Sequence, residues 1–139
     1  MAIDFGSQRV GIALSDESKR FSFSREHIIN DKNLFHSIID FIRRENIEKI
    51  IIGYPLNLKS EKTQQTILTE EFSKKLSDHL KSNSIKAEIV FEDERFTSKI
   101  AQYNIISSGL SKKKRKDKGM TDSVSAQIIL QDYLDRVKP

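Results

Sequence analysis

The sequence contains no cysteine, and only two prolines and five glycines among its 139 residues. Without cysteine the chain has no disulfide bond, no thiolate metal ligand and no cysteine nucleophile, and this composition suits a reducing compartment. Few prolines and glycines, with 37% apolar and 32% charged residues, argue against a disordered or low-complexity chain. The composition therefore predicts an ordinary globular protein without thiol chemistry.

Long apolar runs are also absent. No uninterrupted apolar stretch is longer than Ile50–Ile52, whereas a membrane helix needs roughly 18 such residues. The stretch Met1–Phe5 carries an acid and lacks the basic segment of a secretory signal. We therefore expect no membrane association and a cytoplasmic location.

Two common nucleotide-binding motifs, G-x-x-x-x-G-K-[ST] and G-x-G-x-x-G, are missing. The triplet Asp4-Phe5-Gly6 matches the kinase Asp-Phe-Gly, but the glycine-rich loop, lysine strand and His-Arg-Asp loop of a kinase cannot fit before it. A chain of 139 residues suits one domain, and we assign residues 1–139 to a single domain.

Positive charge is concentrated in one segment. The formal net charge is +4, and residues 112–118, KKKRKDK, hold six basic residues and one acid, so the rest of the chain sums to −1. Such a cluster is typical of contacts with a phosphate backbone, although solvated charged segments are also common. Of the two interpretations we favour contact with nucleic acid.

The period of the apolar residues changes along the chain. Alternation and short apolar runs predict strands at about residues 2–5, 10–15, 20–28, 49–53 and 85–91. Three- and four-residue spacing predicts helices at about 31–46, 61–81, 97–108 and 122–137. The order β-β-β-α-β-α-β-α-α predicts an α/β domain in which helices pack on a mixed sheet that begins with an antiparallel meander.

Asp4 occupies a position where a solvated acid is not expected. It lies inside the first strand, where a buried acid has to be paired or bound to a metal; an edge strand or a salt bridge to Arg9 is the alternative. The strand face that carries Asp4 and Gly6 has two sets of possible neighbours in the second strand. Depending on the register of the first hairpin, they are Gly11 and Ala13 or Val10 and Ile12. Small neighbours would leave room for an ion or a phosphate.

Further acids are expected near Asp4. Asp93 and Glu94 follow a strand, at the end where open α/β sheets bind ligands; only one should join Asp4, and a charged turn with Arg95 is the alternative. Asp122 lies on the apolar stripe of the last helix, although a first-turn acid favoured by the helix dipole also explains it. Three inward carboxylates predict an Mg²⁺ or Mn²⁺ site of the kind that hydrolyses phosphodiesters.

Four motifs occur in the order and spacing of a known family: AIDFGSQRVGIALSD, IIIGYPLN, FEDERFTS and DSVSAQIILQDYL. Together they extend over essentially the whole chain, which resembles the YqgF-type family, described as pre-16S ribosomal RNA nucleases and formerly as Holliday-junction resolvases. The resemblance implies a ribonuclease H-like fold, with a five-stranded mixed sheet whose first three strands are antiparallel.

The resemblance also implies roles for individual residues. Asp4, Glu94 and Asp122 would form a catalytic triad that binds Mg²⁺ or Mn²⁺, with Asp93 in reserve. Residues that shape the site would be Gly6, Gly11 and Pro55. Residues beside the substrate would be Arg9, Asn57, Arg95, Thr97, Lys112, Lys113, Lys114, Arg115, Lys116 and Lys118.

Three functions remain open. The first is an endonuclease that trims the 5′ end of pre-16S ribosomal RNA, free or in ribosomal particles. The second is a resolvase of four-way DNA junctions, which normally needs a symmetric dimer, so both monomer and homodimer are considered. The third is a non-catalytic RNA-binding ribosome-assembly factor.

ATPases of the same fold also begin with an Asp-x-Gly-Ser pattern, which Asp4-Phe5-Gly6-Ser7 matches. These ATPases bind nucleotide between two related domains, and a chain of 139 residues has room for only one.

Overall fold

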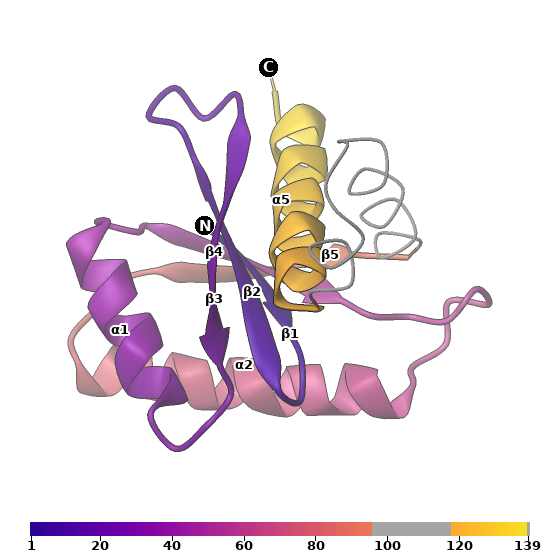
Figure 1. Cartoon of the computed structure of the whole chain (residues 1–139), viewed down its shortest axis with the longest axis horizontal. Coiled ribbons are helices and arrows are strands. Elements are labelled where there is room, and N and C mark those ends of the chain that lie inside the picture. The colour runs from indigo at the N-terminus through magenta and orange to yellow at the C-terminus, as the bar shows by residue number, and fades with distance from the viewer. Residues whose placement is uncertain (96–117, 139) are drawn as a thin grey trace.

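The computed structural model describes residues 1–95 and 118–138 (Figure 1). Its strands are β1 (Ala2–Phe5), β2 (Arg9–Ser15), β3 (Ser22–Ile29), β4 (Lys49–Tyr54) and β5 (Glu88–Asp93). Helices in the described ranges are α1 (Leu34–Arg44), α2 (Gln64–Ser82) and α5 (Lys118–Arg136). None of these helices has the length and apolar content that a membrane crossing requires. The helix expected at 97–108 lies outside the described residues.

All five strands belong to one sheet with the order β3-β2-β1-β4-β5. β2 is antiparallel to both β1 and β3, whereas β4 is parallel to both β1 and β5. The predicted α/β fold with a five-stranded mixed sheet is therefore confirmed, and the architecture is consistent with a ribonuclease H-like fold.

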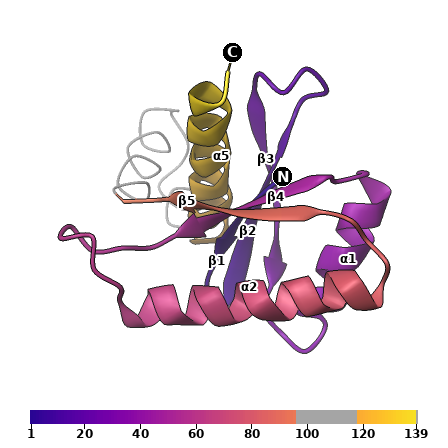
Figure 2. The ribbon, with the colours of Figure 1, turned by 180° about the vertical axis from the view of Figure 1, so that it is seen from behind.

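Helices cover both faces of the sheet. Figures 1 and 2 show α5 on one face and α1 and α2 on the other. The core under α5 is small and consists of Ala2, Ala13, Ile51, Ala126, Ile129, Leu130 and Leu134. The core on the opposite face is larger and includes Ile3, Ile12, Ile38, Ile50, Ile52, Phe72 and Leu76. Because side chains alternate along a strand, Asp4 shares the α5 face with Ala2.

Local hydrogen bonds move the helix starts away from the predicted positions. The carboxylate of Asp31 accepts a hydrogen bond from the Asn33 amide at 2.9 Å, so it forms a turn before α1 instead of lying in the helix. In α2, Thr63 and Thr66 form a reciprocal capping box, which fixes the start at Gln64 instead of Glu61. Both helices therefore begin about one turn later than predicted.

Two other element boundaries also differ. The Ile85 amide donates to the Leu80 carbonyl at 2.9 Å and closes the end of α2, with Ser84 at a φ of 55°, so β5 begins only at Glu88. Helix α5 begins at Lys118, about one turn before the predicted start. Asp122 therefore lies inside the helix instead of opening it.

Candidate active site

Asp4 lies near the carboxyl end of β1 between two glycine-bearing strands. On one side it pairs with Gly11 of β2. On the other side β1 pairs with β4 through Ala2↔Ile51 and Ile3↔Ile52, and the next step of this register places Asp4 beside Gly53. Of the two registers considered for the first hairpin, the structure has the one that places small residues next to the acid.

The carboxyl group of Glu94 extends over β4 toward Asp4. Glu94 follows β5, and its amide donates to the Tyr54 carbonyl at 3.4 Å. Its side chain lies directly over Gly53, where an added Cβ would overlap Oε2 of Glu94 and lie 2.6 Å from Cδ1 of Ile129. The Glu94 side chain is also hydrogen-bonded to Asp4. The structure therefore brings Asp4 and Glu94 together, and Gly53 provides the necessary space.

The proximity of the two acids affects their ionisation. Burial raises the pKa of Glu94 from its ordinary value of 4.5 to about 7; the hydrogen bond with Asp4 acts in the opposite direction, and the charge of Asp93 adds to the increase. Two carboxyl groups in hydrogen-bond contact need a shared proton or a cation between them. The pair therefore has the oxygen donors and the excess negative charge that suit a divalent metal ion.

Asp93 is engaged with Arg95. Its carboxylate accepts hydrogen bonds from the Arg95 backbone amide at 3.0 Å and the Arg95 side-chain Nε at 2.7 Å. Although partial burial acts to raise it, these hydrogen bonds and the charge of Arg95 lower the pKa of Asp93. Glu94, not the reserve candidate Asp93, is the acid in contact with Asp4.

Asp122 belongs to the first turns of α5. The helix runs across the sheet in a direction that brings its first residues toward Asp4 and Glu94. Near the beginning of β4, Lys49 Nζ donates to the Tyr133 hydroxyl at 3.1 Å, whereas near the end of β4, Gly53 lies against Ile129. Moving toward the carboxyl end of β4 thus means moving toward the start of α5. Among described side chains no group of three potential metal ligands forms, and the Asp122 side chain is not one of those described.

The first hairpin turns tightly after Asp4. A Cβ on Gly6 would lie 2.6 Å from the Arg9 carbonyl oxygen, so only glycine fits this close approach. Asn30 Nδ2 donates to the Gly6 carbonyl at 2.8 Å and fixes the turn from the end of β3. Arg9 is partly buried beside this turn. The hairpin residues thus support the strand end that carries Asp4.

The loop between β4 and α2 is held by its own side chains. Oδ1 of Asn57 accepts hydrogen bonds from the amides of Lys59 and Glu61, both at 2.9 Å. Arg95 Nη1 donates to the Ser60 hydroxyl at 2.8 Å and so links this loop to the end of β5. Asn57 therefore organises the loop, and Arg95 connects it to the strand that leads to Glu94.

Several residues expected beside the substrate lie outside the described part of the chain: Thr97, Lys112, Lys113, Lys114, Arg115 and Lys116. Lys118 is the first residue of α5, and its side chain is not described. Gly53 was not among the predicted site residues. A glycine within the continuous aliphatic run of β4 is a signal of close approach, and it could have identified this position.

Comparison with known proteins covers almost the whole chain. The profile of the RuvX family, described as "Holliday junction resolvase", matches residues 1–136. A relative from Sulfurihydrogenibium sp. (strain YO3AOP1), named "Putative pre-16S rRNA nuclease", is 41% identical over 99% of this chain and 90% of its own length. Relatives with the same name from Flavobacterium psychrophilum and Mycoplasmopsis synoviae are 38% and 39% identical, over 98% and 99% of this chain and 96% and 98% of their own lengths. Similarity at this level over nearly the full length shows that the chain belongs to the RuvX family, as its YqgF-type sequence motifs predicted.

Proposed function

We propose that this chain is a metal-dependent endonuclease that hydrolyses a phosphodiester bond near the 5′ end of pre-16S ribosomal RNA. The observation that carries the chemistry is the contact between Asp4 and Glu94 over Gly53, at the carboxyl ends of three neighbouring strands. Ligands bind at this end of open α/β sheets. The names of the relatives supply the RNA substrate.

Asp4, Glu94 and Asp122 would hold Mg²⁺ or Mn²⁺. The donor set fits these ions, because it is made of carboxylate oxygens and because Gly53 leaves room for Glu94 beside Asp4. When bound, the metal would activate water and stabilise the leaving oxygen of the phosphodiester. Glu94 would release its proton as the metal binds, since its pKa of about 7 leaves it partly protonated at neutral pH.

The substrate backbone would cross the basic residues near this pair. Arg9 is the first residue of β2, which pairs with the strand of Asp4, and Arg95 directly follows Glu94; the segment 112–118 carries five further net positive charges. Cations placed in this way neutralise phosphates and release counterions. We assign the whole chain to one nuclease domain, which acts in the cytoplasm where its proposed substrate is made.

A second candidate is a resolvase of four-way DNA junctions, because the matching family is described in these terms. Two symmetric cuts would require a homodimer, whereas RNA trimming needs only a monomer. A third candidate is a non-catalytic RNA-binding assembly factor, in which the acidic pair would be vestigial.

One experiment separates these candidates. The protein is incubated with a leader-containing 16S RNA fragment and with a four-way DNA junction, each in Mn²⁺ and in EDTA. Metal-dependent cleavage of the RNA alone is the expected result. Cleavage of the junction alone would establish the resolvase instead, and RNA binding without cleavage of either substrate would leave only the assembly factor.

Substitutions then test the assigned residues. Asp4→Asn, Glu94→Gln and Asp122→Asn should each lower cleavage by more than about 100-fold while RNA binding persists, because a lost metal ligand costs at least as much as a lost supporting residue. Asp40→Asn is the control, since Asp40 is an exposed acid on α1, on the sheet face opposite α5 (Figure 1), and should leave cleavage within about threefold of the unmodified protein. Normal cleavage by Asp122→Asn would show that the triad is wrong.

A further inference from the structure

The parallel pairing between β1 and β4 ends at Ile3↔Ile52, and Pro55 follows three residues later, just past the end of β4. The Ile51 amide donates to the Met1 carbonyl at 2.9 Å, and the strands pair through Ala2↔Ile51 and Ile3↔Ile52. In a parallel ladder the acceptors of one strand recur at every second residue. Extending the register from Met1 by two such steps pairs the Phe5 carbonyl with residue 55, which is proline and has no amide hydrogen.

A side chain from α2 takes the place of the missing amide. Gln65 Nε2 donates to the Phe5 carbonyl at 2.9 Å, across 60 residues of sequence. Gln65 is the second residue of α2, and Thr63 and Thr66 on either side of it form the capping box. The Thr66 hydroxyl also donates to the Pro55 carbonyl. The start of α2 is thus attached both to Pro55, just past the end of β4, and to the Phe5 carbonyl at the end of β1.

This replacement occurs one residue after Asp4. The Phe5 ring stacks on Phe72 with ring centroids 4.4 Å apart, which fixes the side chain of that residue on the α2 face. The Gln65 amide fixes its carbonyl. Rotation of the Asp4–Phe5 backbone, which would redirect the Asp4 carboxylate, is therefore opposed by one apolar contact and one hydrogen bond.

We propose that Gln65 is a positioning residue for the metal site, because its amide replaces the absent Pro55 amide and holds the end of β1 in the orientation that presents Asp4 to Glu94. The inference rests on the proposed function, since it takes Asp4 as a metal ligand. The Gln65 side chain donates its hydrogen bond to a backbone carbonyl, so Gln65 acts through the position of Asp4 and is no catalytic residue.

The test measures Mn²⁺ affinity by isothermal titration calorimetry without nucleic acid, and kcat and KM with the leader-containing RNA. Gln65→Leu removes the donor while keeping a similar volume. Gln64→Leu is the matched control, because Gln64 is exposed on the same helical turn. We expect Gln65→Leu to weaken Mn²⁺ affinity by about 10-fold or more and to lower kcat with KM within about twofold, and Gln64→Leu to change neither.

A second variant guards against a folding defect in the first. Gln65→Glu keeps the shape of the side chain, but it can donate to the Phe5 carbonyl only when protonated. The ratio of wild-type to variant Mn²⁺ affinity should therefore narrow as the pH falls from 8 toward the ordinary glutamate pKa of about 4.3, whereas a merely damaged fold would show no such recovery.

The failures of the two proposals are distinguishable. If Asp4→Asn binds Mn²⁺ as well as the unmodified protein, the proposed metal site is wrong. If Asp4→Asn loses Mn²⁺ while folded Gln65→Leu and Gln65→Glu retain full affinity and kcat, the metal site stands and the positioning role of Gln65 is overturned.

Discussion

The carboxyl group of Glu94 occupies the space above Gly53 that a side chain would fill in any other residue. This relationship joins two neighbouring parallel strands, because Gly53 lies in β4 and Glu94 follows β5. It also lets an acid that leaves β5 reach across β4 to Asp4 in β1. The glycine in β4 thus determines whether Glu94, which follows β5, can contact Asp4 in β1.

Gly53→Ala should damage both the site and the packing of α5. The new methyl group would overlap Glu94 Oε2 and Ile129 Cδ1, so we expect a loss of about 1–3 kcal/mol in unfolding free energy and at least a 10-fold loss of Mn²⁺ affinity. Urea unfolding and calorimetry measure the two effects. Ile52→Val, at the adjacent position on the other face, should cost about 1 kcal/mol without changing Mn²⁺ affinity. Equal Mn²⁺ affinity in both variants would contradict the role of Gly53.

The raised pKa of Glu94 predicts that the metal-free protein loses stability as the pH rises. The folded state holds the Glu94 proton up to about pH 7, whereas an unfolded glutamate releases it near 4.5. Between these values the native state binds more protons, so its stability falls as the pH increases. Urea unfolding in EDTA at pH 5 and pH 8 measures this loss.

Glu94→Gln provides the comparison for this pH dependence, because glutamine cannot ionise. The variant should lack the Glu94 contribution and be more stable than the unmodified protein at pH 8 in EDTA. Added Mn²⁺ should restore the stability of the unmodified protein only. An identical pH profile for the two proteins would show that Glu94 titrates normally.

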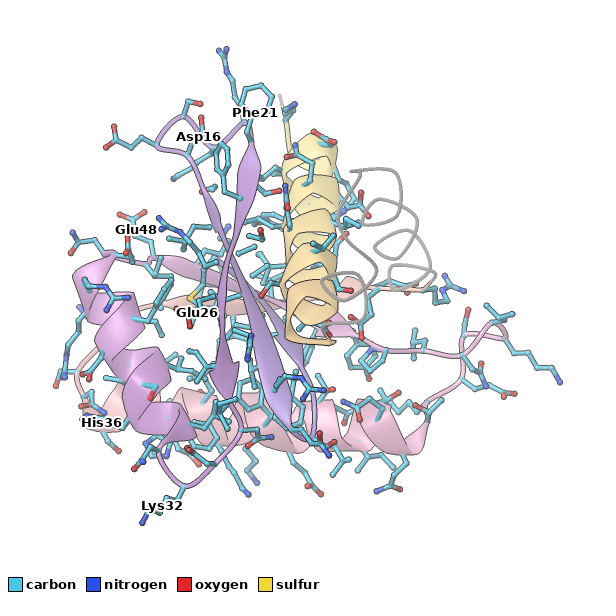
Figure 3. All side chains as sticks on the ribbon, viewed as in Figure 1. Asp16, Phe21, Glu26, Lys32, His36 and Glu48 are labelled. Carbon is cyan, nitrogen blue, oxygen red and sulfur yellow. The ribbon has the colours of Figure 1, made fainter. Side chains whose placement is uncertain are left out.

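The ionised Asp16 carboxylate should stabilise the β2–β3 hairpin at neutral pH, and this contribution should be lost in acid. Figure 3 shows Asp16 and Phe21 at the same end of this hairpin. The Asp16 carboxylate accepts hydrogen bonds from the amides of Phe21 at 2.9 Å and Arg20 at 2.8 Å and from the Ser18 hydroxyl. The Phe21 and Ser18 bonds are the main causes that lower the pKa of Asp16 from 3.8 to about 2.

A depressed pKa contributes stability above pH 3.8 that is lost as the pH falls through about 2. The difference in melting temperature between the unmodified protein and Asp16→Asn should therefore be largest near pH 5 and shrink toward pH 2. Glu17→Gln, at an exposed neighbouring position, is the control. A carboxyl NMR titration of Asp16 with a midpoint near 3.8 would contradict this prediction.

The basic segment 112–118 should set the salt dependence of nucleic-acid binding. Replacing Lys113, Lys114, Arg115 and Lys116 with alanine should reduce the slope of log K against log salt by about 3, since each neutralised phosphate contributes roughly 0.7–0.9. Fluorescence anisotropy at several salt concentrations measures the slope. The pair Lys74→Ala and Lys75→Ala on α2 is the control for surface charge elsewhere. An unchanged slope would identify the segment as solvated surface.

The spacing of apolar residues and the alternation of side chains along strands predicted much of the fold and part of the site. Alternation located β1, β2 and β3, and the continuous run Ile50–Ile52 located β4, because these patterns depend on burial in one sheet. Consecutive residues of a strand point to opposite faces of the sheet, so only one of Asp93 and Glu94 was expected to lie beside Asp4. Strand alternation alone left the choice between them open; the family resemblance favoured Glu94, and Glu94 is the acid whose side chain contacts Asp4.

Other features could not be read from periodicity. Helix starts depended on which of several polar residues donate or accept hydrogen bonds, so Asp31 formed a turn and Thr63 became the cap. The contact of Gln65 with Phe5 depends on a register between β1 and β4 that a single sequence does not reveal. The catalytic roles of Asp4, Glu94 and Asp122 remain predictions.

The face of the sheet beneath α5 buries Ala2, Ala13 and Ile51, whereas the opposite face buries a larger set of isoleucine, leucine and phenylalanine side chains. β1 and β4 are inner strands that are hydrogen-bonded to a neighbour on both sides, whereas α5 packs on the sheet along one face only, so its amides should exchange with deuterium earlier than those of β1 and β4 under native conditions. The residue expected to complete the acidic triad lies on this helix. Local opening of α5 would therefore remove Asp122 from the site while the sheet stayed folded, and the protein would lose its chemistry before it lost its structure.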